Sequence, residues 1–500
     1  MIGKAIRSAT HFFRSDLGIR FIAEGAVRSS AFVLTPLLSW SLGAHVFGGY
    51  LQIMSLSFAF VPLVSAGLGF TVIRQLAGHR NSTQGPHLLA IALGIISALC
   101  VALAAALALL SDTIMSYFAL SMFEHRNWLA LTIPALAWIF ATEALVGEYL
   151  RALIKARASL YVQIAGFGLH MTGLVGILLF GELSLETALL SIAAAKLIII
   201  GLVLGPAFLR THRKFKGRST IPPFRTAVAG LPFMLAGLAE WAANLGDRLI
   251  VGRFLGSEAV AHYGAGIMML SVIAALGAPV WWMLFPTVAK SVKGRDIEGC
   301  RNAVKHYTML FLELALPVMA LAVLIANPAI SLLLNSSVEQ MTPVILIAGS
   351  AIVVSQVTTG WEYYLVTISS GKRLMIATII CSSVGFAVAW HFAPASGLAG
   401  IAAGMLTGKL CLAIFYAISA NRNGFGGTVW RSSKLILLCT LNTIALLLTY
   451  LAVRSLPPST TVITEIAIPA LIFSALYCSG RYLITTTERR LDTQANNVKS

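Results

Sequence analysis

The chain has 500 residues, of which 58% are hydrophobic and 11% are charged, and its mean hydropathy is +0.84. This composition excludes an ordinary soluble multidomain protein and indicates a polytopic membrane protein. The net charge of +17 requires no nucleic-acid partner, because basic loops that face anionic lipid account for it.

Fourteen hydrophobic segments, each long enough to cross about 30 Å of hydrocarbon, follow one another along the chain. Their predicted limits are 19–42, 46–70, 87–111, 127–150, 159–181, 187–209, 227–251, 259–284, 304–327, 340–368, 375–393, 397–420, 435–453 and 462–484. Most of the 36 Lys and Arg residues fall in the connections on one side, and only Arg126, Arg253 and Arg454 fall in those on the other. The positive-inside rule therefore predicts cytoplasmic N- and C-termini. We expect no removable signal peptide.

The chain repeats itself at an offset of 213 residues. This offset carries Leu42-Gly43 and Tyr50 onto Leu255-Gly256 and Tyr263, and Lys196-Leu197 onto Lys409-Leu410. Two distant landmarks with one offset indicate a duplication of six spans, whose copies share an orientation. We therefore predict an all-α membrane protein of about 14 transmembrane helices. It contains two six-helix lobes (1–212 and 213–423), related by a pseudo-twofold axis along the membrane normal, and two appended C-terminal helices (424–500).

The connections between the predicted spans are too short to hold a folded catalytic domain. The six cysteines are scattered and have no metal-ligand spacing, and no HExxH, GxSxG or dinucleotide motif is present. We therefore expect no enzymatic activity, no metal and no cofactor.

Four cations lie inside the predicted spans: Arg28, Lys196, Arg248 and Lys409. Each costs roughly 2.5–3.5 kcal/mol at the centre of a span, so such residues normally face a cavity or a bundle interior. Lys196 and Lys409 both fall near the midplane at 1.5 Å of rise per residue. We predict that they face each other across the two lobes and bind an anionic substrate. The alternative is that each lysine pairs with a carboxylate for structural reasons.

Carboxylates inside the spans are candidates for binding a coupling ion. Glu24 and Arg28 have i, i+4 spacing, at which side chains on a helix meet. Glu240, Asn244 and Asp247 follow a helical rhythm on one face of the seventh span, with Arg248 adjacent. Both groups are equally compatible with neutral structural pairs that lower the cost of insertion.

Other titratable residues within the spans are interpreted as structural. Glu143 and Glu148 are expected to pair locally with the basic residues that follow them, Arg151, Lys155 and Arg157. Glu313, Glu362, His170 and His391 are expected to be single titratable residues with no constellation of charged groups around them.

Two segments resemble a known family. The stretch from Leu42-Gly43 to Tyr50, and the run from Asn244 to Gly256 (NLGDRLIVGRFLG) leading into Tyr263, are similar to the polysaccharide-transporter and lipid-linked-oligosaccharide flippase branch of the multidrug/oligosaccharidyl-lipid/polysaccharide exporter superfamily. O-antigen flippases belong to this branch. The resemblance implies two six-helix bundles around a cavity that opens alternately to either side. It also implies that Arg28, Asp247 and Arg248 occupy positions where such flippases carry charged residues.

The resemblance implies a flippase that moves a polyprenyl-diphosphate-linked oligosaccharide from the inner to the outer leaflet of a bacterial inner membrane. The expected partners are that glycan lipid, membrane lipids and a coupling ion, H⁺ or Na⁺. The first alternative is a drug/cation antiporter of the same superfamily, which predicts twelve spans and an acidic cavity. The second is a membrane enzyme acting on lipid-linked glycans (a glycosyltransferase, ligase or polymerase), which predicts a substantial external loop.

Overall fold

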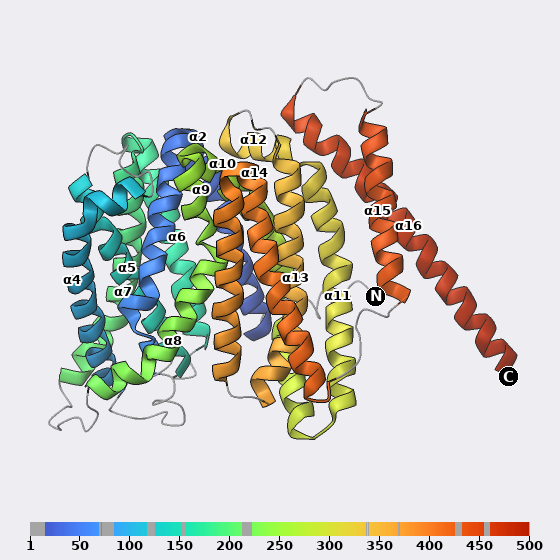
Figure 1. Ribbon diagram of the computed structural model, residues 1–500, viewed down its shortest axis with the longest axis horizontal. Helices are drawn as coiled ribbons and strands as arrows, with labels where there is room; N and C mark the ends of the chain where they lie inside the picture. Colours follow the sequence, from blue (N-terminus) through green and yellow to red (C-terminus); the bar gives the residue numbers. More distant parts are fainter. Residues whose placement is uncertain are drawn as a thin grey trace, which may run out of the picture. The chain divides into compact units, whose positions relative to one another are not determined.

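The computed structural model describes residues 16–69, 72, 85–117, 126–152, 156–212, 223–336, 338, 340–368, 371–425, 433–454 and 461–499. Within these ranges every regular element is a helix (Figure 1), which confirms the all-α class. The helices are α2 (Asp16–Ser65), α4 (Gly85–Tyr117), α5 (Arg126–Ala152), α6 (Ala156–Phe180), α7 (Leu185–His212), α8 (Pro223–Asn244), α9 (Asp247–Leu255), α10 (Ser257–Lys293), α11 (Ile297–Leu324), α12 (Ala326–Leu334), α13 (Met341–Ile368), α14 (Gly371–Arg422), α15 (Ser433–Arg454) and α16 (Val462–Lys499).

Eleven helices in the described part are long and apolar enough to span a membrane. Two of them, α2 and α14, bend at Gly43 (φ 76°) and Gly397 (φ 57°), and each covers two of the predicted spans. A positive φ at these bends suits glycine, which has no β-carbon to clash with the backbone. Since α8 and α9 together cover the predicted seventh span, all fourteen predicted spans correspond to helix.

The seventh span is broken, whereas the sequence predicted one continuous helix. The helix α8 ends at Asn244, where the N–H groups of Leu245 and Gly246 both donate to the carbonyl of Trp241 (2.8 and 3.2 Å). A second helix, α9, then begins at Asp247. The seventh span is therefore two helices, and the prediction that Glu240, Asn244 and Asp247 line one face stays a prediction.

The helices form two compact units. One unit contains Met1–Ala265 with Ser370–Gly408, and the other contains Gly266–Ser369 with Lys409–Ser500. In the first unit a buried apolar cluster joins α2, α4 and α5 around Val64, Leu89 and Ala137. The division at 212 and 423 into two symmetric six-helix lobes and an appended pair stays a prediction.

The second half of α2 packs closely on α8, α9 and α10 within the first unit. A β-carbon on Gly48 would lie 1.7 Å from the carbonyl oxygen of Ser257, and one on Gly67 would lie 2.2 Å from that of Gly230. In lipid, helix association depends on such close packing of small residues, because the surrounding chains are as apolar as the side chains. We call this contact the α2 seam.

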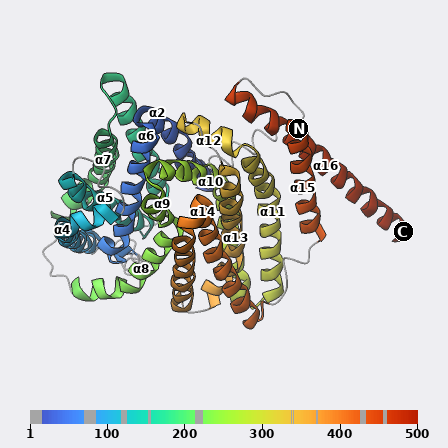
Figure 2. The same ribbon diagram turned by 45° about the horizontal axis from the view of Figure 1, so that its top comes forward.

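In the second unit, α15 and α16 lie next to α11 and α12 (Figure 2). Ala320 of α11, Ala445 of α15 and Phe473 of α16 form their common buried cluster. The last two helices are therefore packed into the second unit.

Candidate functional site

Two helices of the first unit bring an ion pair to the middle of their spans. Lys196 lies near the centre of the apolar span of α7, and Glu143 lies near the centre of that of α5. The Lys196 ammonium donates a hydrogen bond to Glu143 Oε1 at 2.5 Å, and the two side chains are only 20% and 21% exposed. At this depth water screens the pair weakly, so the attraction between the two charges is much stronger than at a surface.

The sequence located Lys196 at the midplane but did not identify its partner. Of the two possibilities left open for this lysine, carboxylate pairing is the one that the contact with Glu143 supports. The two residues lie 53 positions apart on different helices, so no local spacing rule connects them. The prediction that Glu143 pairs locally with the basic residues that follow it is therefore wrong.

His170 of α6 belongs to the same region. Its side chain is 4% exposed, and the charge of Lys196 acts on its imidazole. The Nε2 atom is buried and has no hydrogen-bond partner in the described part of the chain. The prediction that His170 has no charged group around it is therefore wrong.

A second polar site lies at the turn between α8 and α9. Oδ1 of Asp247 accepts a hydrogen bond from the backbone N–H of Arg248 (2.8 Å), and Oδ2 accepts one from the fully buried Tyr263 hydroxyl (2.7 Å). The carboxylate therefore holds the start of α9 against α10. The Nε atom of Arg248 is buried and has no hydrogen-bond partner among the described residues.

Residues of α2 in the α2 seam form hydrogen bonds with the turn between α8 and α9. Ser55 donates to the carbonyl of Leu245 (2.8 Å), and the Trp241 indole donates to the carbonyl of Ser55 (2.9 Å). Nearby, the Ser257 hydroxyl donates to Gln52 Oε1 (3.2 Å) in a buried position. The broken span is thus fixed by polar contacts that sequence periodicity did not indicate.

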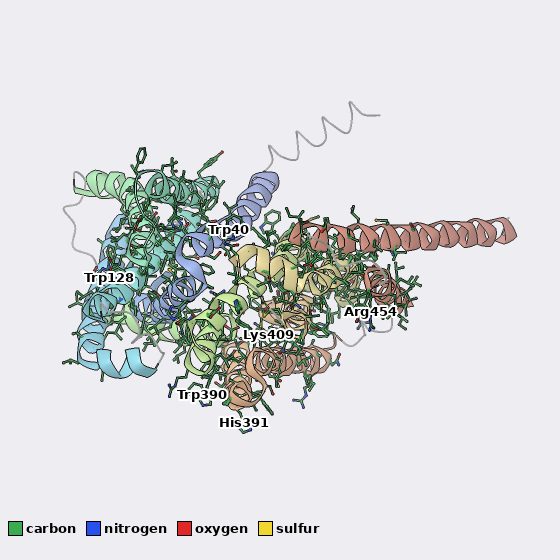
Figure 3. All side chains as sticks on the ribbon, turned by 90° about the horizontal axis from the view of Figure 1, so that it is seen from above. Trp40, Trp128, Trp390, His391, Lys409 and Arg454 are labelled. Atoms are coloured by element: carbon green, nitrogen blue, oxygen red, sulfur yellow. The ribbon has the colours of Figure 1, made fainter. Side chains whose placement is uncertain are left out.

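The other predicted site residues are placed as follows. Lys409 is a half-buried residue of α14 (Figure 3) and belongs to the second unit, whereas Lys196 belongs to the first. Glu240 is an exposed residue of α8. The side chains of Glu24 and Arg28 on α2 lie outside the described residues. A cavity between paired lysines therefore stays a prediction.

Glu313 was expected to have no charged group around it, and this prediction is wrong. Its Oε2 atom lies 3.0 Å from a guanidinium nitrogen of Arg481, which reaches it from α16. Both side chains are about one-third exposed. The sequence did not indicate this pair because the two residues are far apart in the chain.

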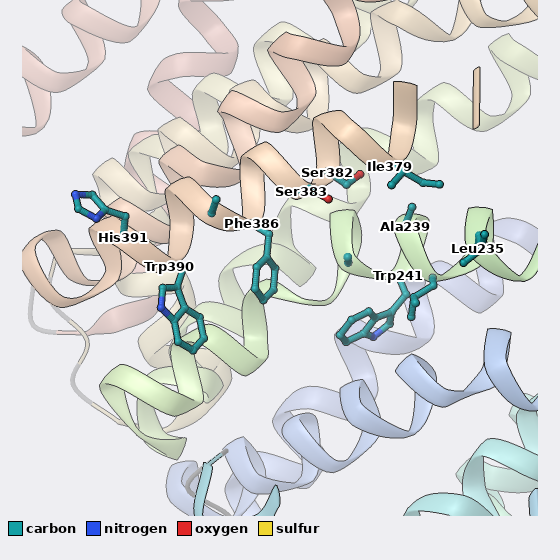
Figure 4. A pocket seen from close by; sticks show the side chains of 12 residues that line it. Leu235, Ala239, Trp241, Ile379, Ser382, Ser383, Phe386, Trp390 and His391 are labelled. Carbon is teal, nitrogen blue, oxygen red and sulfur yellow. The ribbon is translucent and has the colours of Figure 1, made fainter. Parts of the chain in front are cut away.

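An apolar cavity of about 840 Å³ lies between α8 and the first half of α14, within the first unit (Figure 4). Trp241, Phe386 and Trp390 supply its aromatic walls, and Ser382 and Ser383 its hydroxyls. His391 is an exposed residue at the edge of this cavity. None of the predicted cations lines the cavity, so it is suited to hydrocarbon.

Comparison with known proteins agrees with this architecture. Residues 14–292 match the family model described as "Polysaccharide biosynthesis protein", and residues 232–391 match the model described as MatE. Among curated proteins, none matches this sequence.

Three solved structures illustrate the fold. An inward-facing multidrug resistance MATE family transporter of the MOP superfamily is 16% identical, with a TM-score of 0.63 over 81% of this chain and 98% of that chain. The lipid II flippase MurJ, in an inward closed conformation, is 14% identical, with a TM-score of 0.64 over 93% and 100%. A MOP superfamily transporter from Pyrococcus furiosus is 16% identical, with a TM-score of 0.53 over 83% and 96%. At these identities the similarity establishes the fold.

Proposed function

Because this chain belongs to the family of polysaccharide biosynthesis proteins, we propose that it moves a polyprenyl-diphosphate-linked oligosaccharide from the inner to the outer leaflet of a bacterial inner membrane. It is a multi-pass membrane transporter of the MOP superfamily, whose solved members include drug exporters and a lipid II flippase. Beyond membership of this superfamily, the proposal specifies the substrate, the membrane and the direction of transport. It also places both termini in the cytoplasm.

One observation carries the proposal: the polysaccharide family match at residues 14–292 falls on a fold built from membrane-spanning helices. Glycans assembled on a lipid carrier inside the cell have to cross the bilayer before they are used outside. In such a pathway, a protein made of membrane helices is suited to the crossing step.

The charges within the spans fit a phosphorylated headgroup. A diphosphate is a compact polyanion, and it offsets the cost of burying the cations that bind it. In a cell that is negative inside, outward movement of an anion is favoured by roughly 2.3 kcal/mol per charge per 100 mV. We propose Arg28, Lys196, Arg248 and Lys409 as the cations that bind the headgroup.

Resetting of the transporter requires an energy source, and we propose a coupling ion, H⁺ or Na⁺. Glu24, Glu240 and Asp247 are the carboxylates proposed from the sequence to bind it. Of these, Asp247 is engaged by Tyr263 and by the turn of α9, which also supports a structural contribution.

To test the proposal, the protein is depleted from its native cell, and the distribution of glycan lipids between the two leaflets is measured. If the proposal is right, a lipid-linked oligosaccharide accumulates on the inner leaflet, where a membrane-impermeant lectin added to the outer face does not label it. Unchanged outer-leaflet labelling would refute the proposal. The MatE match favours drug export as a second candidate, for which depletion would instead raise drug sensitivity. A change in glycan length without a change in leaflet would indicate a glycan-processing enzyme.

The residue assignment has its own test. We expect Lys196→Ala combined with Lys409→Ala to abolish translocation while the protein is still inserted. A matched variant, Lys372→Ala, removes an exposed cation at the start of α14 and should translocate normally. Full activity in the double variant would remove the lysines from the substrate site.

A further inference from the structure

One face of α6 lies against α7 at the depth of the ion pair. Gly166, His170 and Gly173 have i, i+4, i+7 spacing and therefore share this face. A β-carbon on Gly166 would lie 3.9 Å from Lys196 Nζ, and one on Gly173 would lie 2.9 Å from Ser191 Oγ. His170 is therefore in the interface, between the levels of Lys196 and Ser191.

Two polar atoms in this interface have no hydrogen-bond partner in the described part of the chain. They are His170 Nε2 and Ser191 Oγ, and both are buried. A buried polar group without a partner destabilises a folded protein, so such groups are few in native structures and each one needs an explanation. Together with the neighbouring Glu143–Lys196 pair, they form a cluster of polar groups within the apolar spans of α5, α6 and α7.

A carboxylate, an ammonium and an imidazole nitrogen without a partner are all groups that can bind or release a proton. We propose that Glu143, His170 and Lys196 form a proton-binding site in the middle of the α5, α6 and α7 spans. When the Glu143 carboxylate takes up one proton it becomes a neutral acid, and the ion pair is reduced to a single hydrogen bond. The Lys196 ammonium then carries an uncompensated charge, and the imidazole of His170 is the adjacent group that can accept or return the proton.

The five helices that pack together here carry other titratable groups. The described ones are His45 and Tyr50 of α2, Cys100 of α4, Glu148 and Tyr149 of α5, Tyr161 of α6 and Glu186 of α7. On α2, Glu24 and Arg28 are also titratable, and their side chains lie outside the described residues. Among the described side chains, Glu143 is the carboxylate that pairs with Lys196.

The proton-binding site specifies how the proposed transport is coupled to an ion. Its role in transport therefore rests on the proposed function. Protonation of Glu143 releases Lys196 to bind an anionic headgroup, and deprotonation restores the ion pair and expels the anion. This alternation links headgroup binding to proton uptake. It makes the proton the coupling ion and assigns it to residues other than Glu24, Glu240 and Asp247.

The first experiment does not depend on the transported substrate. Infrared difference spectra of the full-length protein in lipid nanodiscs are recorded as the pH is lowered, and the stretching band of protonated carboxyl groups is followed. We expect Glu143→Gln to lose one component of this band. The control Glu186→Gln, at the exposed start of α7, should retain it. Identical spectra for the wild type and Glu143→Gln down to the pH of unfolding would overturn the proton site and leave a purely structural ion pair.

A second variant controls for misfolding, which is a risk in Glu143→Gln because this change leaves the Lys196 charge without its counter-ion. Glu143→Gln combined with Lys196→Met removes both charges at nearly constant volume. This pair should fold and should also lack the band component. Retention of the component in the folded double variant would assign it to another carboxyl group and overturn the proposal.

The second experiment measures transport of a lipid-linked oligosaccharide in proteoliposomes, with and without an imposed pH gradient. Because proton uptake accompanies headgroup binding, we expect a gradient that is acidic on the side from which the glycan lipid departs to raise the wild-type rate and to have no effect in Glu143→Gln. If the wild type moves no glycan lipid, the proposed function fails, but the infrared result still decides the proton site. If Glu143→Gln responds to the gradient as the wild type does, the link between this site and transport is refuted.

Discussion

Replacement of Gly48 by alanine tests the α2 seam, because an added β-carbon has no room there. The β-carbon would lie 1.7 Å from the carbonyl oxygen of Ser257 and 2.5 Å from its carbonyl carbon, where ordinary contacts are 3.4–4 Å. Both contacting atoms belong to the backbone, so rotation of a side chain cannot relieve the overlap. The backbones of α2 and α10 would have to separate by roughly 1.5 Å.

The expected change in the free energy of unfolding is the difference between the cost of overpacking and the gain in helix propensity. Overpacking of this kind costs about 1–3 kcal/mol or more, whereas alanine in place of glycine inside a helix gains at most about 1 kcal/mol. Because the overlap is with backbone, we place its cost at the upper end and expect a net destabilisation of about 2 kcal/mol. Separation of the seam would also disturb the hydrogen bonds that hold the turn before α9.

The assay is thermal unfolding in detergent, followed by the fraction of protein that remains monodisperse on a sizing column. Gly94→Ala on α4 is the matched control, because nothing lies within 4 Å of a β-carbon at that helical position. It should unfold at the wild-type temperature or slightly above it. Equal unfolding temperatures for Gly48→Ala and Gly94→Ala would refute the close approach of α2 and α10.

The remaining predictions concern single contacts and use the same thermal assay. Tyr263→Phe removes the hydrogen bond to Asp247 and should destabilise the protein by about 1.5–3 kcal/mol, as expected for a bond to a charged group. Glu313→Gln leaves Arg481 without its partner and should cost about 2 kcal/mol, between the values for exposed and buried pairs. Adding Arg481→Gln should recover most of that loss. Gly43→Ala should cost about 1–3 kcal/mol through backbone strain alone, because the position has space for a methyl group but a φ of 76°.

Each of these variants has a control that separates its mechanism from a general effect. Tyr450→Phe removes a hydroxyl from an exposed tyrosine and should leave the unfolding temperature unchanged. Gly201→Ala adds a methyl group in open space without a positive φ and should be neutral or stabilising. If the double variant of Glu313 and Arg481 is no more stable than Glu313→Gln, the two side chains do not stabilise each other.

The sequence by itself determined the membrane fold and much of its helix pattern. Apolar segments of about 20 residues have to be helices in a bilayer, because only then does each segment satisfy its own backbone hydrogen bonds. This requirement is local, so the predicted spans and the observed helices agree. Glycine at the bends and lysine at the midplane could likewise be recognised from the residues themselves.

Tertiary structure decided which charged groups meet. The partner of Lys196 is Glu143, that of Glu313 is Arg481, and that of Asp247 is Tyr263. These choices depend on how each helix is rotated about its axis and which helices are neighbours. Small residues such as Gly48 and Gly230 set those rotations through close packing, since in lipid no hydrophobic force orients one apolar face over another. Helix formation depends on the residues of one segment, whereas side-chain pairing depends on the packing of several helices at once.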